Sequence, residues 1–196
     1  MLSNYLARMA VTSMGSLVRP NTHVLAEVDL PLRIWPSDLD IWGHVNNGRY
    51  LTLMDHGRLD HGLRTGLLPA MFKRRCRPLL GGASVQYRRE VRAFERCTLV
   101  TKLAAWDEKW LYYEQRLERR GELCARAVVR AVLKVGRKTL PPAELLAELG
   151  MHAPSPVAPE ALTSSWTGSP LALPSTVSGA SLANVSLPGL VVTAAG

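Results

Sequence analysis

One helical stretch is followed by four stretches of alternating residues, and this order limits the folds open to the chain. The helical stretch spans residues 47–64 and places Tyr50 and Met54 on one stripe. The alternating stretches are residues 79–91, 97–106, 110–117 and 123–135. Alternation is typical of half-buried strands, and the short links at 107–109 and 120–121 are typical of hairpins. Because a sheet must bury its apolar face, the order predicts an α+β fold with an antiparallel sheet wrapped around one central helix.

A polar run at residues 37–51 connects a further predicted strand to the helix and includes the first residues of that helix. That strand spans residues 24–35, alternates from Val28 onward, and is ended by Pro36, which cannot donate to a sheet ladder. The run therefore falls at a strand-to-helix junction, where a helix N-terminus offers unpaired N–H groups and partial positive charge. A carboxylate beside free N–H donors is a candidate reaction centre.

Seven residues of this run have a defined spacing, Asp-x-Asp-x-x-Gly-His-x-Asn-Asn-x-x-Tyr. They are Asp38, Asp40, Gly43, His44, Asn46, Asn47 and Tyr50. The pattern, followed by a long helix, resembles the signature of the hotdog-fold acyl-CoA thioesterases of the 4-hydroxybenzoyl-CoA thioesterase-like family. Within that family it is most similar to the poorly characterised thioesterase-superfamily proteins. The resemblance implies a hotdog fold and hydrolysis of an acyl-CoA thioester to free acid and CoA.

The resemblance assigns the reaction to Asp40, which would attack the thioester carbonyl directly or activate a water. Backbone N–H groups near the start of the helix would hold the thioester oxygen. The expected substrate-binding residues are Gly43, His44, Asn46, Asn47, Gly48 and Tyr50. Asp55 is the second candidate carboxylate, because another hotdog branch uses a carboxylate on this helix. The alternative role for Asp40 and Asn46 is that of a turn residue and a helix cap.

Two other functions remain open at this point. A hotdog hydratase would pair an aspartate with a histidine, here Asp40 with His44, although the hydratase loop pattern is missing. A non-catalytic hotdog protein would bind acyl-CoA or lipid without turnover. Asp38 is expected to orient the loop through a side-chain hydrogen bond. His56 and Asp60, at i and i+4, predict a surface salt bridge rather than a metal site, and neither metal nor cofactor is expected.

Positive charge is concentrated in the first 150 residues. The chain carries 24 Lys and Arg against 16 Asp and Glu, and Glu160 is the one charged side chain after residue 150. This excess favours a polyanionic partner: nucleic acid, acidic lipid or the phosphates of coenzyme A. With the resemblance, CoA is the expected partner and nucleic acid is not. The basic residues expected at its phosphates are Arg88, Arg89, Arg92 and Arg96, with the segment 73–77.

The remaining features define the predicted organisation of the chain. We expect a loosely ordered arm at residues 1–22, the hotdog domain at 23–138, a short helix within 139–150, and a disordered Ser/Pro-rich tail at 151–196. No apolar run is long enough to span a bilayer. Three widely spaced cysteines indicate a reducing, cytoplasmic location. The resemblance also implies a homodimer or homotetramer with sites between chains.

Overall fold

The computed structural model describes residues 2–19, 21–156 and 191–192. The helices are α1 (Leu2–Val18), the 3-10 turn η1 (Pro36–Asp38), α2 (Asn47–Arg64), α3 (Leu67–Lys73) and α4 (Pro142–Ala147). The strands are β1 (Val28–Arg33), β2 (Arg77–Tyr87), β3 (Arg96–Trp106), β4 (Trp110–Arg119), β5 (Glu122–Val135), β6 (Lys138–Leu140) and β7 (Val191–Val192). The predicted helix and strands are confirmed, whereas α3 and β6 were not expected.

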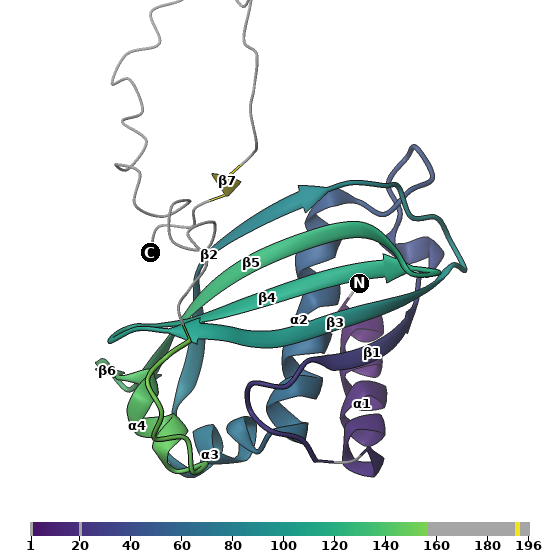
Figure 1. Cartoon of the computed structure of the whole chain (residues 1–196). Helices are drawn as coiled ribbons and strands as arrows, with labels where there is room; N and C mark the ends of the chain where they lie inside the picture. The colour runs from purple at the N-terminus through teal and green to yellow at the C-terminus, as the bar shows by residue number, and fades with distance from the viewer. Residues whose placement is uncertain (1, 20, 157–190, 193–196) are drawn as a thin grey trace, which may run out of the picture.

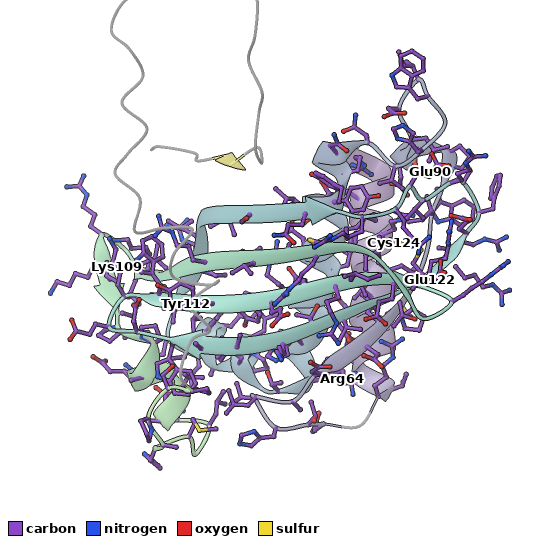
Figure 2. The ribbon with its side chains drawn as sticks, turned by 45° about the horizontal axis from the view of Figure 1, so that its top comes forward. Arg64, Glu90, Lys109, Tyr112, Glu122 and Cys124 are labelled. Atoms are coloured by element: carbon purple, nitrogen blue, oxygen red, sulfur yellow. The ribbon has the colours of Figure 1, made fainter. Side chains whose placement is uncertain are left out.

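The strands form one antiparallel sheet that curls around α2 (Figure 1). Their order is β1-β3-β4-β5-β2-β7, with β6 paired to β5, and β7 meets β2 only at Ala83 and Ser84. The hairpin after β3 turns at residues 107–109, where the Asp107 carboxylate accepts the N–H groups of Lys109 and Trp110. Lys109 lies at one end of the sheet, and Glu90 and Glu122 lie at the other (Figure 2).

The core lies between α2 and the inner face of the sheet. Leu53 and Met54 of α2 are each 1% exposed. Gly57 allows α2 to approach β3 closely, because a Cβ there would lie 2.6 Å from Leu99 Cδ2 and would also collide with Thr101 Oγ1. The inner strand residues that join this core include Leu99, Leu103, Leu111, Leu117, Val129 and Leu133. The prediction that α2 is the central, buried helix is confirmed.

The loosely ordered arm expected at residues 1–22 is wrong for most of its length, because Leu2–Val18 forms α1. α1 runs alongside α2 in the same direction (Figure 1): Met9 lies against His56, Ser16 donates to Asp60, and Thr22 N–H donates to the Arg64 carbonyl. These polar contacts with α2 order α1, and a weak apolar stripe does not reveal them.

The chain stays packed on the domain beyond α4. Met151 is 8% exposed within the core cluster, and Ser155 Oγ accepts the Trp106 N–H at 2.8 Å. These residues therefore differ from the disordered tail expected from residue 151 onward. The remainder of that predicted tail, residues 157–190 and 193–196, lies outside the described residues. None of the described helices is long and apolar enough to cross a membrane.

Candidate active site

The polar run forms an ordered loop between β1 and α2. Its two sides pair with each other: Leu39 bridges Val45, Asp40 N–H donates to the His44 carbonyl at 2.9 Å, and Gly43 makes the reversal with φ +80°. A positive φ of this size favours glycine. Val45 N–H also donates to the Val91 carbonyl, so the loop is fastened to the segment between β2 and β3.

Asp40 lies near the tip of this loop with its side chain 20% exposed. One carboxylate oxygen accepts the Trp42 N–H at 2.9 Å, and the other lies 3.2 Å from His44 Nδ1. Asp40 therefore fits both roles considered for it. Its carboxylate makes an Asx turn and still presents an oxygen to the partially exposed His44. The carboxylate is oriented, reachable and paired with a group that could move a proton.

The first residues of α2 offer fewer donors than expected. Asn46 caps the helix, and its Oδ1 accepts the Gly48 N–H at 2.9 Å, as the capping role predicts. The Asn46 N–H is taken by the Asp38 carbonyl at 2.9 Å. The N–H groups expected to hold a thioester oxygen are those of Asn46, Asn47 and Gly48, and of these only that of Asn47 has no acceptor among the described residues.

Tyr50 lies in the core rather than at the surface of the site. It is 3% exposed, burial raises its pKa to about 12, and its ring meets that of Tyr87 edge-on with centroids 5.0 Å apart. The Tyr87 hydroxyl donates to the Asn47 carbonyl at 3.0 Å. Tyr50 and Tyr87 therefore pack beneath the first turn of α2 and support it.

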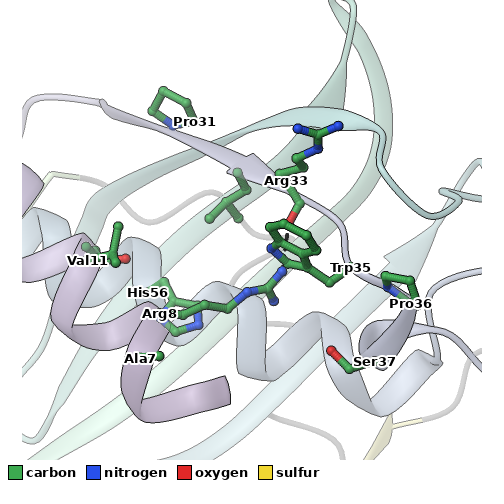
Figure 3. A pocket seen from close by; sticks show the side chains of 11 residues that line it. Ala7, Arg8, Val11, Pro31, Arg33, Trp35, Pro36, Ser37 and His56 are labelled. Carbon is green, nitrogen blue, oxygen red and sulfur yellow. Dashed lines mark hydrogen bonds between the residues drawn. The ribbon is translucent and has the colours of Figure 1, made fainter. Parts of the chain in front are cut away.

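Asp38 is the buried centre of a network that the sequence only partly indicated. Its side chain is fully buried, and one oxygen accepts the Trp35 N–H at 2.9 Å, as expected for a loop-orienting residue. The other oxygen accepts hydrogen bonds from Arg8 of α1 at 3.0 Å and Arg49 of α2 at 2.9 Å. Arg8 also donates to the Arg33 carbonyl at 2.7 Å (Figure 3). One carboxylate thus joins α1, β1, the loop and α2.

The arginines expected at CoA phosphates form two separate groups. Arg92 lies beside the loop, since His44 bridges it, but its guanidinium pairs with Glu90 at 2.7 Å. Arg89 pairs with Glu122 at 3.8 Å, and Arg88 makes a 3.5 Å hydrogen bond to Gln86. Arg96 has no ion pair among the described residues.

The second group, residues 73–77, follows α3 at the other end of α2 (Figure 1). The 18 residues of α2 span about 27 Å. Within one chain, residues 73–77 therefore lie too far from Asp40 for both groups to contact the phosphates of one CoA there, and Arg74 pairs with Glu148. The role of this segment at CoA stays a prediction.

The carboxylates of α2 have other partners. Asp55 pairs with Arg58, which also donates to Gln115. The surface salt bridge predicted for His56 and Asp60 is wrong, because α1 covers both. Asp60 instead accepts from Ser16 at 2.6 Å, and no group of three or more metal-ligating side chains occurs among the described residues.

Two cavities flank α1, and Asp40 lines neither. One is a groove of about 680 Å³ between α1, β1 and residues 35–37, with Arg8, Trp35 and His56 on its walls (Figure 3). The other has about 280 Å³ and lies between α1, α2, α3 and the inner face of the sheet. The sequence predicted neither cavity, because α1 contributes a wall to each.

The known proteins that this chain matches share its domain. The model of the thioesterase-like superfamily matches residues 34–149, more than half of the chain. The chain belongs to the thioesterase-like superfamily. Protein THEM6 of Danio rerio is 35% identical over 118 residues, and that of Xenopus laevis is 34% identical over 113. The alignments cover 57% of this chain and only 58% and 55% of those relatives.

Solved structures of thioesterases have the same architecture. YbaW, a probable thioesterase of Escherichia coli, aligns with a TM-score of 0.55 and 22% identity over 62% of this chain and 97% of its own. A Thermus thermophilus thioesterase, solved with coenzyme A and Zn, aligns with a TM-score of 0.56 and 22% identity over 62% of this chain and 90% of its own. The fold is the hotdog fold expected from the motif.

Proposed function

We propose that this superfamily member hydrolyses acyl-CoA thioesters to free acid and CoA, with Asp40 as nucleophile or general base. The observation that carries the proposal is the placement of Asp40: an oriented, partially exposed carboxylate beside His44, on the loop that leads into the N-terminus of α2. The superfamily match and the CoA bound to the Thermus thermophilus structure support the choice of substrate.

Each part of the site has a task in this reaction. The Asn47 N–H and the positive end of α2 would stabilise the negative charge that develops on the thioester oxygen. By one route the Asp40 carboxylate attacks the carbonyl carbon, the C–S bond breaks, and water then cleaves the resulting anhydride. By the other route Asp40 removes a proton from the water that attacks. Both routes release one carboxylic acid and the CoA thiol, which takes up a proton.

The test is to measure thiol release from acyl-CoA by Asp40→Asn. Asparagine keeps an acceptor oxygen for the Trp42 N–H but cannot act as nucleophile or base, so turnover should fall by at least about a hundredfold. Asp29→Asn, on the exposed outer side of β1, is the matched control and should keep full turnover.

Unchanged turnover in Asp40→Asn would remove the assignment and make Asp55→Asn the next variant. Equilibrium binding of acyl-CoA without hydrolysis by the unmodified protein would instead support the non-catalytic alternative. Hydration of an enoyl-CoA would identify the hydratase alternative, which also needs Asp40 and His44 together.

A further inference from the structure

α1 lies outside the family match, which begins at residue 34. It is nevertheless built into the molecule by buried contacts. Arg8 bonds the fully buried Asp38, and Ser16 and Arg19 contact the equally buried Asp60 at 2.6 Å and 3.3 Å. The helix therefore has a fixed position against α2, and its inward side chains can form part of a site.

The cavity of about 280 Å³ is enclosed by α1 on one side. Tyr5 and Met9 form the α1 wall, and His56 of α2 holds both: its ring lies 5.5 Å from that of Tyr5, and its Nδ1 lies 2.9 Å from Met9 Sδ. The other walls are mostly apolar. They include Leu59 of α2, Leu67 and Met71 of α3, and Leu111 and Ala131 of the sheet.

The charges at this cavity cancel each other. Asp55 and Arg58 line it, but they pair with each other, and Arg58 also donates to Gln115. The cavity therefore offers no uncompensated charge to a ligand, while its lining supplies a large apolar surface. An uncharged, apolar chain is therefore the ligand whose surface this lining would bury most favourably.

The position along α2 relates this cavity to Asp40. Its α2 residues run from Asp55 to Gly62, which are 8 and 15 residues after Asn47 at the start of the helix. At 1.5 Å per residue they lie about 12 to 22 Å along the axis. A thioester held at the helix N-terminus would therefore direct only a long acyl chain into the cavity.

We infer that the cavity binds the distal part of a medium- or long-chain acyl group, and that Met9 of α1 sets the preferred chain length. The inference rests on the proposed function for the position of the thioester. It assigns a substrate-selecting role to a helix outside the family match.

The test compares saturated acyl-CoA substrates of increasing chain length on Met9→Trp. The larger ring should fill the cavity, so kcat/KM for long chains should fall by at least about tenfold while that for short chains stays unchanged. Leu59→Trp, which fills the same space from α2, should act in the same direction. Met14→Trp is the matched control, because this methionine of α1 is 70% exposed and lines neither cavity.

Equilibrium binding of the same acyl-CoA series to Asp40→Asn separates this inference from the proposed function. If Asp40→Asn retains turnover but Met9→Trp still weakens long-chain binding selectively, the role of Asp40 fails and the cavity assignment stands. If both tryptophan variants are folded by circular dichroism and keep the chain-length profile of Met14→Trp, the cavity assignment is overturned.

Discussion

Two buried histidines of α2 make the stability of the protein sensitive to mild acid. Burial lowers the pKa of His56 and His61 to about 4, from the ordinary value of 6.5. His61 Nε2 lies 3.1 Å from the Val24 carbonyl, so the neutral ring can donate a hydrogen bond to this carbonyl. Between those pH values the unfolded chain binds protons that the folded chain does not.

The free energy of unfolding should therefore be at its highest above pH 6.5 and decrease as the pH falls toward 4. Each histidine can contribute up to about 1.4 kcal/mol per pH unit. Urea unfolding at a series of pH values measures this slope. Glu27, Glu95 and Asp107 have lowered pKa values and add to the loss only at lower pH. His61→Gln retains a donor for Val24 and should reduce the slope; an unchanged slope would contradict the assignment to His61.

At the same scale, the candidate site shows which roles a sequence can and cannot reveal. The spacing of Asp40 and Asn46 predicted a turn and a cap because each role uses neighbours within a few residues. The partners of Asp38 are 30 and 11 residues away at Arg8 and Arg49, and no local pattern connects them. The sequence does not show that the cap occupies the Gly48 N–H, because this contact depends on the orientation of the Asn46 side chain.

Most strands of the sheet were predictable because apolar residues alternate along their sequences, while α1 was not. β5 alternates over most of its 14 residues, whereas α1 exposes Leu6, Met14 and Leu17 and is ordered by polar contacts with α2. Gly57 marks the close packing of α2 on β3, because a glycine inside a helix lowers helix propensity and here leaves room for Leu99 and Thr101.

Two glycines in helices should therefore respond in opposite ways to alanine. Gly57→Ala places a Cβ against Leu99 and Thr101 of β3 and should destabilise the protein by about 1–3 kcal/mol or more. Gly15→Ala in α1 meets nothing within 4 Å and should stabilise it by about 0.5–1 kcal/mol through helix propensity. Thermal unfolding of the two variants checks the signs, and a neutral Gly57→Ala would mean that α2 does not lie this close to β3.

The shape of the whole molecule indicates where a second copy would bind. The motif resemblance implies a homodimer or homotetramer, and Asp40 lines neither of the two cavities beside α1. The sheet has two edges. At one of them, β1 carries Asp29, Pro31 and Arg33, which protect an edge strand from pairing. β2 instead exposes Leu79 and Leu80 at 50% and 48%, and β7 covers it only at two positions.

We therefore expect a homodimer that associates through β2, with each site completed by the partner chain. Light scattering at micromolar concentration should give twice the mass of one chain. Leu79→Lys introduces a charge on the associating strand and should shift the mass toward that of a monomer, with a parallel loss of turnover. Leu6→Lys, at a leucine of α1 that is 56% exposed, is the matched control and should leave the mass unchanged. A monomeric unmodified protein would exclude this interface, and a dimer that survives Leu79→Lys but not Leu6→Lys would move the interface to α1.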